Sequence, residues 1–453
     1  MSKFRLETTN EIIGSNSGIV LAGMILTGDI FKNQIYSTLG KQTKYSINHF
    51  TDYEIIKSYI GLLCVGKTSY ESIDIFRTDK IFMTSLGMKK LPSKEILRQR
   101  LEKMNEKADE GFRIFTAEFI KKYGKLEFIK DTNYLQIDFD VTPFDNSNSS
   151  KEGVSWTYKN FIGFAPMITY IGTNGYMLNN EFREGKSHSN CKGTDDYIRR
   201  TIELARNITK DKKLLLRFDS GNDSVNNIFA INEYENVFFL IKKNLRGYDS
   251  QNHINQILAS ECIKEEIREG KIIYYHEENV AISKKNSNIF DTIIVRQISR
   301  VIKRTIDRKG QTLLFPDYEV AVWHTSIESD YDAKKIVEIY KDHGTSEQFH
   351  SELKTDMNIE RLPSSKFKTN RLILSMGMVA FNILRLIGQE MINSGFHYRK
   401  RKVKRLRLRK VIQDIMYMAG KFLIKHKLPT LKLPKTNIFR NAFEFIFNKL
   451  QLE

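Results

Sequence analysis

The sequence predicts an α/β protein, and three features of the chain carry this prediction. Residues 134–141 alternate apolar and polar side chains, which is typical of a strand with one buried face. Residues 214–218 form an apolar run of strand length, and Ile198, Ile202 and Ala205 recur at helical spacing between the two. This order of strand, helix and strand indicates a sheet with helices packed on it.

The first 125 residues are predicted to be mainly helical. Ser93 follows Pro92 and is a suitable N-cap, and Leu97, Leu101 and Met104 then recur at helical spacing. Basic residues near the exposed side of this stretch suit either docking in a DNA groove or a dimerisation role. We therefore expect a helical N-terminal domain that binds DNA or dimerises.

Residues 126–245 are predicted to form the first part of an α/β core. One helix is expected to begin at Thr194 or Asp195, and another to span residues 222–234. After the strand at 134–141, further strands are expected at residues 156–158, 164–171, 176–182, 214–219 and 237–241.

Residues 246–318 are predicted to be a β-rich insertion, because short strands alternate there with charged turns. The strand pattern at 318–325 leads back to the core, whose second part we assign to residues 319–398. That part includes a long apolar helix from Leu372 to Ile392. Residues 399–453 complete the chain as a basic C-terminal segment.

Composition limits the class of protein. The chain shows neither a run of 18 apolar residues nor the apolar stretch of a signal peptide at its start, so we expect a cytoplasmic protein without a membrane partner. Cys64, Cys191 and Cys262 are odd in number and far apart. They support neither a disulfide framework nor a structural zinc site.

The charge is strongly basic and concentrated near the C-terminus. The formal net charge is +18, and +13 of it falls in the last 55 residues. Nine cations within residues 399–410 repel one another unless a polyanion neutralises them. Arginine and leucine alternate at residues 405–409 as in a strand, whereas a lipid-binding helix would show a clean apolar face, so the pattern favours nucleic acid over a membrane surface. The predicted DNA-binding residues of this run are Arg399, Lys400, Arg401, Lys402, Arg405, Arg407 and Arg409.

Three acids are candidate metal ligands. Asp140 ends the strand at 134–141, Asp219 ends the next buried strand, and Glu347 lies in a late helix. Carboxylates that converge at strand ends supply the oxygen ligands that Mg²⁺ prefers, and a two-metal site activates a nucleophilic oxygen in phosphodiester chemistry. Asp138 points to the same side of its strand as Asp140 and remains an alternative first ligand.

Residues 340–354 place the third acid. The pattern predicts the end of one helix, a break at Gly344, and a new helix capped by Thr345 with Gln348 completing a capping box. Glu347 then falls in the first turn, where the helix dipole favours a carboxylate. The alternative interpretation is an ordinary amphipathic helix with a solvated charged face.

The arrangement of these acids resembles that of the DDE transposases of bacterial insertion sequences. The order Asp140, Asp219, Glu347 is the same, with a β-rich insertion before the last acid. Residues 137–142 and 217–221 are similar to the two aspartate motifs of one large branch of these enzymes.

The same branch carries a Tyr-x2-Arg-x3-Glu-x6-Lys signature. Tyr340, Glu347 and Lys354 match it, whereas His343 stands where the signature has arginine. The resemblance is to the group 1 DDE transposase family and covers roughly residues 90–425. A histidine loses the bidentate contact that arginine makes to a phosphate but keeps a hydrogen-bond donor.

The resemblance implies a ribonuclease-H-like core and metal-dependent DNA cleavage and strand transfer, with Mg²⁺ as the ion and Mn²⁺ as its substitute. It assigns Asp140, Asp219 and Glu347 as metal ligands and Tyr340 and Lys354 as DNA contacts. It favours Asp140 over Asp138 because a threonine follows two residues later.

Trp323 belongs to the last strand before Glu347. In related transposases a tryptophan at a similar place stacks on an unpaired base, and the alternative is a core residue. The implied partners are double-stranded DNA with terminal inverted repeats and further copies of the chain in a dimer or larger synaptic complex. Two other functions stay open: a nuclease of the same fold without strand transfer, and a non-catalytic DNA-binding protein derived from a transposase.

Overall fold

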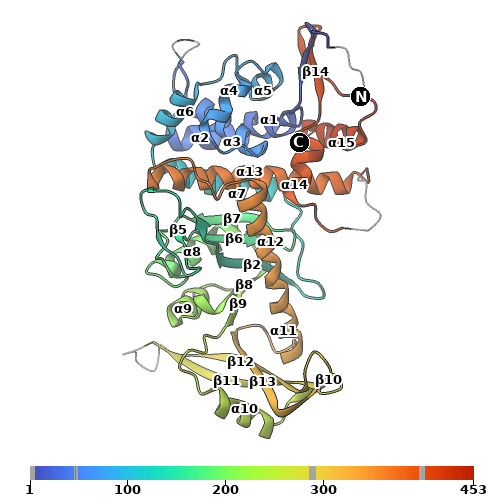
Figure 1. Ribbon diagram of the computed structural model, residues 1–453. Coiled ribbons are helices and arrows are strands. Elements are labelled where there is room, and N and C mark those ends of the chain that lie inside the picture. Colours follow the sequence, from blue (N-terminus) through green and yellow to red (C-terminus); the bar gives the residue numbers. More distant parts are fainter. Residues whose placement is uncertain (1–5, 45, 47–48, 285–291, 397–402, 453) are drawn as a thin grey trace. The chain divides into compact units, whose positions relative to one another are not determined.

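The computed structural model describes residues 6–44, 46, 49–284, 292–396 and 403–452 (Figure 1). The chain divides into two compact units. The sheet unit comprises Leu126–Pro143 and Ala165–Phe349, and the helical unit comprises Met1–Lys125, Phe144–Phe164 and His350–Glu453. The predicted DNA-binding residues that lie outside the described residues are Arg399, Lys400, Arg401 and Lys402.

The sheet unit is built on one mixed sheet. Its first five strands along the chain are β2 (Tyr134–Val141), β6 (Met167–Ile171), β7 (Tyr176–Glu181), β8 (Lys213–Phe218) and β9 (Val237–Lys242). They stand in the order β7-β6-β2-β8-β9. β6 pairs antiparallel with both β2 and β7. β8 pairs parallel with both β2 and β9. Parallel neighbours place their carboxyl ends at one edge of the sheet.

Helices connect the parallel strands. α8 (Thr194–Ile208) joins β7 to β8, and α9 (Val225–Asn232) joins β8 to β9. α8 packs against β7 and α9, and α9 packs against β9. The helix from Thr194 and the strands on either side of it were expected, and the mixed sheet with its covering helices confirms the predicted α/β class.

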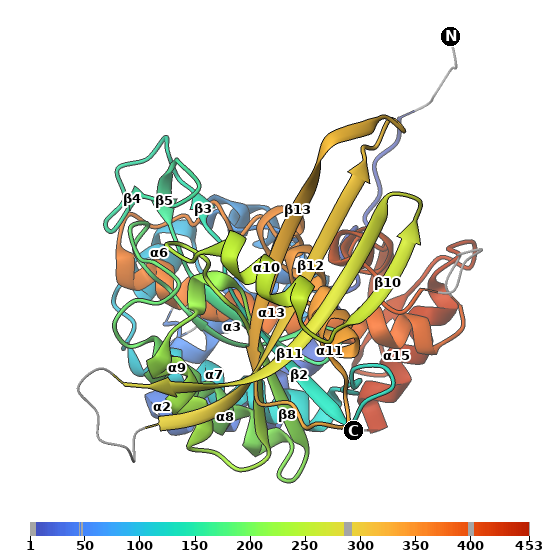
Figure 2. The same ribbon diagram turned by 90° about the horizontal axis from the view of Figure 1, so that it is seen from below.

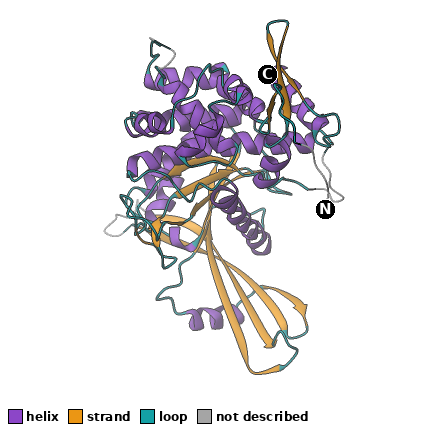
Figure 3. Ribbon diagram, turned by 45° about the horizontal axis from the view of Figure 1, so that its top comes forward, coloured by secondary structure: helices purple, strands orange, loops and turns teal. Residues whose placement is uncertain are grey.

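The chain between β9 and the next core helix continues the same sheet. It contains α10 (Ser250–Ala259), β10 (Ile263–Arg268), β11 (Lys271–Ser283), β12 (Thr292–Ile306) and β13 (Thr312–Thr325). These strands form a long antiparallel ribbon (Figure 3), and α10 packs across β11, β12 and β13 (Figure 2). The carboxyl end of β13 pairs with β9, for example Trp323 with Lys242, so this region extends the sheet at its β9 edge.

One apolar core lies between the ribbon, the parallel strands and α11 (Ala333–Lys341). It includes Leu215 and Leu240 of the parallel strands, Trp323 of β13, and Ile336 and Ile339 of α11. Burial of these side chains holds α11 against the sheet, because each buried aliphatic side chain contributes about 1.5–3 kcal/mol.

The helical unit combines segments from three parts of the chain. Its longer helices are α1 (Ile19–Thr27), α2 (Asp29–Leu39), α3 (Asp52–Cys64), α6 (Lys94–Glu102), α7 (Lys107–Tyr123), α13 (Phe367–Asn393) and α15 (Arg440–Leu452). α13 packs against both α3 and α7. Ser93 caps α6 as the sequence predicts, with its hydroxyl accepting from the Ile96 N–H at 3.3 Å.

Shorter elements complete this unit. They are α4 (Ile73–Phe76), α5 (Lys80–Ser85), α14 (Leu408–Val411), one sheet of β3 (Phe144–Asp145), β5 (Ile162–Phe164) and β4 (Ser155–Trp156), and another of β1 (Ile12–Gly14), β14 (Gly420–Lys425) and β15 (Leu428–Lys432). The first 125 residues thus share one compact unit with the C-terminal segment. The domain boundaries expected from the sequence remain a prediction.

α13 is the long apolar helix expected near residues 372–392. By length and composition it would cross a bilayer, but 94% of its most apolar window is buried inside the protein. A helix that is apolar all round is normal in the core of a large protein, so this is weak evidence for a membrane span.

Candidate active site at the ends of two parallel strands

The register of β2 and β8 brings two of the predicted ligands face to face. Phe139 pairs with Phe218 in the parallel ladder, so Asp140 and Asp219 follow at the next position. Neighbouring strands lie about 4.8 Å apart, and paired residues point to the same side of the sheet. The chain therefore holds two carboxylates side by side at the carboxyl edge of the parallel strands.

Asp219 is partly buried and held by its own turn. Its Oδ1 accepts from the Gly221 N–H at 3.1 Å and from the Asn222 amide at 2.8 Å. Burial, followed by the negative charge of Asp140, raises the pKa of the Asp219 carboxyl. The two acids repel each other at neutral pH, and a bound cation would relieve that repulsion.

Asp138 occupies a different electrostatic position two residues earlier, on the same side of the sheet. It pairs in register with Arg217, and both side chains are buried. Arg217 donates to Asp138 from Nε at 2.6 Å and from Nη2 at 2.8 Å, and Gln136 donates to Oδ2 at 2.9 Å. His343 completes the set through Nδ1, 3.1 Å from Oδ1.

These contacts determine the protonation of Asp138. Burial alone would raise the pKa of this carboxyl, but the charge of Arg217 and the hydrogen bonds from His343 and Arg217 lower it to about 2. Both oxygens already have cationic or amide partners. The geometry therefore favours Asp140 as the first ligand, and Asp138 anchors Arg217, whose Nη1 donates to the Ile339 carbonyl of α11 at 2.6 Å.

The helix that carries the third acid differs from the sequence expectation. The predicted break at Gly344 does not occur, because Asp342–Gly344 continue as a 3₁₀ turn into α12 (Thr345–Ser351), and Thr345 itself has helical φ and ψ of −66° and −26°. The predicted cap at Thr345 is therefore wrong. Tertiary contacts decide the outcome: Phe349 is fully buried and packs on Tyr170 at 5.0 Å.

Gly175 in the turn between β6 and β7 makes room for this packing. Its φ is +67°, and a Cβ there would lie 2.2 Å from the Phe349 ring. Any other residue would displace the aromatic ring or strain the turn. The close approach of backbone to ring fixes the first turns of α12 in the sheet unit.

A continuous helical segment aligns the signature residues. Tyr340, His343 and Glu347 are spaced by three and four residues, so they share one helical face. His343 touches Asp138, and the Asp219 and Asp140 charges add to burial in raising the pKa of the Tyr340 phenol. Glu347 is exposed on the same face, about 10 Å along the helix axis from Tyr340.

The structure does not gather all three acids. Among the described residues, no group of three His, Cys, Asp or Glu lies close enough to hold a metal ion. The Asp140–Asp219 pair fits a hard divalent cation, because the two carboxylates lie side by side and the hydrogen bonds from Gly221 and Asn222 both go to Oδ1 of Asp219. Glu347 would be the third ligand, and its assignment stays a prediction.

Trp323 and Lys354 were also candidates, and each has contacts within its own unit. Trp323 is buried in the core, and its ring lies 5.5 Å from that of Tyr340 with the two planes tilted by 59°, so its geometry supports the core alternative. Lys354 belongs to the helical unit, where its Nζ lies 3.0 Å from Glu360. Their predicted DNA contacts remain untested.

The C-terminal arginines are engaged within the helical unit. Arg405 pairs with Glu352, which also binds Arg385 at 2.6 Å with both partners buried. Arg407 and Arg409 both pair with Asp356, at 2.7 and 3.2 Å. These contacts stabilise the fold around a buried carboxylate pair, and DNA binding by these arginines remains a prediction.

Sequence reasoning missed Arg217 and Asn222. Arg217 stood inside an apolar strand run, and an arginine at such a position needs a buried acid on the neighbouring strand. Asp138 supplied that signal, but the pairing depends on a register that the sequence does not give. Asn222 gave no signal beyond ordinary turn chemistry.

A family model described as "Transposase DDE domain group 1" matches residues 1–452. The chain belongs to this transposase family. This confirms the resemblance drawn from the aspartate motifs and the signature around Glu347, and extends it over the whole chain. At the coarse level, membership makes the protein a polynucleotidyl transferase or nuclease of the DDE type, a class that generally uses divalent metal.

Two further comparisons add little. The chain is similar to the piggyBac transposase in a cryo-EM structure of its synaptic complex with hairpin DNA, at 10% identity and a TM-score of 0.42. The likeness covers 96% of this chain and 82% of that one. A search of curated proteins gave no match.

Proposed function

We propose that this transposase cleaves DNA at the terminal inverted repeats of an insertion sequence and transfers the freed strand ends, using Asp140, Asp219 and Glu347 with Mg²⁺. The proposal rests on the positions of Asp140 and Asp219, one residue beyond the last paired residues of β2 and β8, where the charge of Asp140 acts on Asp219, in a member of the DDE family. Mn²⁺ would substitute, because it takes the same oxygen ligands.

The strand order supports a ribonuclease-H-like core. Three antiparallel strands are followed by two strands parallel to the first, with helices between the parallel strands. β10–β13 would then be the insertion that precedes the helix of the third acid. The proposed core places the first two acids on its central strands and leaves the third on a helix.

The bound ion would supply Lewis-acid stabilisation of the attacking and leaving oxygens of an in-line displacement. The chain's own residues hold the ion and its surroundings. Asp140 and Asp219 supply carboxylate oxygens from adjacent strands, and Glu347 supplies a third from α12. Gly221 and Asn222 fix the orientation of the Asp219 carboxylate.

The buried network beneath the acids positions the helix. Arg217 links Asp138 on β2 to the Ile339 carbonyl on α11, and His343 links the same carboxylate to the 3₁₀ turn after α11. We propose His343 as a positioning residue rather than a phosphate contact, because it is buried and bonded to Asp138. Tyr340 and Lys354 remain the proposed DNA contacts near the cut.

The proposed partners are double-stranded DNA with terminal inverted repeats and a second copy of the chain, since two element ends must be joined. The phosphate contacts would set the position of the duplex, and base contacts would select the repeat. A nuclease on the same core is the second candidate; its cleavage would not depend on the repeat.

The test uses a labelled duplex carrying the inverted repeat that flanks the coding sequence. Wild type is compared with Asp219→Asn and Glu347→Gln, and Asp223→Asn serves as a control because Asp223 is also a buried acid with a raised pKa. Cuts at the repeat boundary that need Mg²⁺ and vanish in the first two variants support the proposal. Tight repeat binding without cleavage in Mg²⁺ or Mn²⁺ would overturn it.

A further inference from the structure

The cations of the C-terminal segment fall into two groups within the helical unit. Arg405, Arg407 and Arg409 pair with Glu352 and Asp356. By contrast, Lys425, His426, Lys427, Lys432 and Lys435 are exposed, and no carboxylate partner is found for them among the described residues. Unbalanced positive charge is thus concentrated on and beside the β14–β15 hairpin, which follows the run at residues 399–410 within the same basic C-terminal segment.

The lysines of the two hairpin strands lie on one face of the ribbon. The register pairs Lys425 with Leu428 and Lys421 with Lys432, so the lysines of both strands point to one side. Phe422 and Leu431 point to the other side, and Ile12 of β1 joins them through its pairing with Phe422. One face of the ribbon therefore carries all of its strand lysines, together with Leu423, Leu428 and Thr430, and the opposite face carries none.

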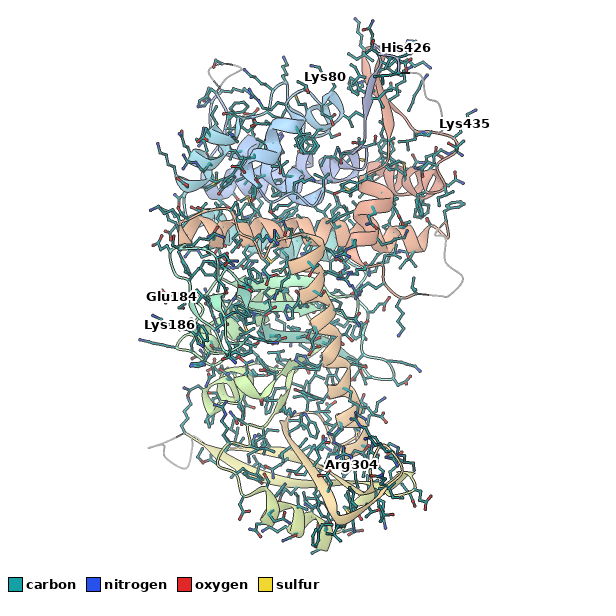
Figure 4. The ribbon with its side chains drawn as sticks, viewed as in Figure 1. Lys80, Glu184, Lys186, Arg304, His426 and Lys435 are labelled. Carbon is teal, nitrogen blue, oxygen red and sulfur yellow. The ribbon has the colours of Figure 1, made fainter. Side chains whose placement is uncertain are left out.

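The tip of the hairpin carries backbone conformations that favour glycine. His426 and Lys427 form the two-residue turn with φ of +53° and +67° (Figure 4). Such turns usually contain Asn-Gly, because bulky residues with positive φ are strained. The chain instead places two basic side chains at the tip of the hairpin. Backbone strain of this kind is typical of functional positions.

We propose that the β14–β15 hairpin binds double-stranded DNA, with Lys425, Lys427 and Lys432 on backbone phosphates and His426 at the tip. A two-stranded ribbon fits the major groove of B-DNA, which is about 12 Å wide. Lysines along one face and at the tip then reach the phosphates on either side of the groove. This inference rests on the proposed function for its ligand, and it assigns the contact to a surface outside the acids and the signature.

A membrane surface is the competing occupant, because Ile424 and Leu428 are 69% and 67% exposed beside the tip. A ribbon that inserts into lipid would carry apolar residues at its tip. Here Lys425, His426 and Lys427 occupy the tip itself, and charge complementarity with a duplex is the stronger argument.

The test measures binding of full-length protein to a fluorescent 30-base-pair duplex of mixed sequence over a range of salt concentrations. The hairpin variant combines Lys425→Gln, His426→Asn, Lys427→Gly and Lys432→Gln. Its Asn-Gly turn suits the observed backbone, so folding is preserved. A matched control removes three exposed lysines elsewhere through Lys41→Gln, Lys210→Gln and Lys309→Gln.

The hairpin variant should bind about 10–100-fold more weakly at 100 mM salt, and the slope of log K against log[salt] should fall by about two to three, because each lost phosphate contact removes roughly 0.9. The control variant should change this slope by less than about 0.9, the value expected for one phosphate contact. Replacing the three hairpin lysines by arginine should keep both affinity and slope.

An unchanged salt slope in the hairpin variant, with its thermal unfolding intact, overturns the inference. Loss of binding to phosphatidylserine vesicles with unchanged duplex binding overturns it in favour of a lipid surface. If the proposed function is wrong but this inference is right, the wild-type protein should bind the duplex through the hairpin and yet cleave no DNA.

Discussion

Two successive rungs on the same face of β2 and β8, with the Phe139–Phe218 pair between them, have opposite electrostatic outcomes. At one rung Asp138 faces Arg217, and the pair is buried, bidentate and further bonded to His343 and Gln136. At the next rung Asp140 faces Asp219, and the two like charges raise the cost of keeping both ionised. The first rung is neutralised by the chain itself, whereas at the second rung we propose that a bound cation does so.

The comparison separates charges that build the fold from charges that await a ligand. Asp138 and Glu352 have arginine partners and are almost fully buried. Asp219 and the hairpin residues Lys425, Lys427 and Lys432 have no charge of opposite sign within ion-pair distance among the described residues, whereas Lys421 of the same hairpin pairs with Glu11. Unbalanced charge at a fixed position is thus the most useful indicator of function in this molecule.

The largest expected effect is on chemistry at the second rung. Asp219→Asn should lower the rate of end cleavage at least about 1,000-fold, because one proposed ligand is lost. The same change should leave the fold intact or more stable, since it removes a repulsion. Gel analysis of end cleavage and thermal unfolding measure the two effects, and a variant that unfolds at a lower temperature would contradict the ligand assignment.

The first rung should respond in stability. Arg217→Met should cost about 3–5 kcal/mol of unfolding free energy, because it leaves Asp138 buried without its cation. The double variant Asp138→Asn with Arg217→Met should recover part of that loss. Urea unfolding is followed by the emission of Trp323, which is buried in the sheet unit, in a Trp156→Phe background.

A cost below about 1 kcal/mol for Arg217→Met would show that water or another cation reaches Asp138. Lys213→Met is a suitable control, because Lys213 pairs with Glu328 in a partly exposed salt bridge at the other end of the same strand. Such exposed pairs contribute roughly 0–1 kcal/mol.

Metal binding should stabilise the wild-type protein but not a variant that lacks Asp219. Mg²⁺ or Mn²⁺ at ten to thirty times its dissociation constant should stabilise the wild-type sheet unit by about 1–2 kcal/mol. The stabilisation should be absent in Asp219→Asn and retained in Asp223→Asn. Differential scanning fluorimetry with and without EDTA measures this; equal shifts in all three proteins would mean that the ion binds elsewhere.

A third type of buried group gives a pH-dependent effect. Burial, and then the charge of Lys243, lowers the pKa of His324 to about 4, and its Nε2 lies 3.1 Å from Gln297 Oε1. The unfolded chain binds this proton near pH 6.5, so the native state loses stability as the pH falls from about 6.5 to 4.

The loss attributable to His324 should be about 2–3 kcal/mol, and His324→Gln should remove it. The measurement is the difference in unfolding free energy between the two proteins at pH 7 and at pH 4.5. A difference that does not change with pH would mean that His324 is already charged in the native state.

Much of this architecture was readable from local patterns. β2 and β8 were identified by alternation and by an apolar run, and each stopped at the acid that now faces the other. What local patterns lack is register: a shift of two residues would pair Asp140 with Arg217 and remove the repulsion. Two acids at strand ends were predictable, but their opposition was not.

The helix of Glu347 shows the same limit. Gly344 and Thr345 favoured a break, yet the buried Phe349 and the contact of His343 with Asp138 keep the chain helical through this point. His343 was read as a substitute for a phosphate-binding arginine. A partner 205 residues away in sequence decides its surroundings, and no local spacing reports that distance.

The pairing of β1 with β14 has a consequence for biosynthesis. Ile12 pairs with Phe422, so the sheet that contains the first strand, β1, forms only after the second-last strand, β14, has been synthesised. The sheet unit is largely made of one continuous stretch and can close earlier on the ribosome. A nascent or truncated copy would therefore carry the acids before it has assembled the sheet that supports the basic hairpin, and cleavage competence and DNA capture would arise at different moments in the life of the chain.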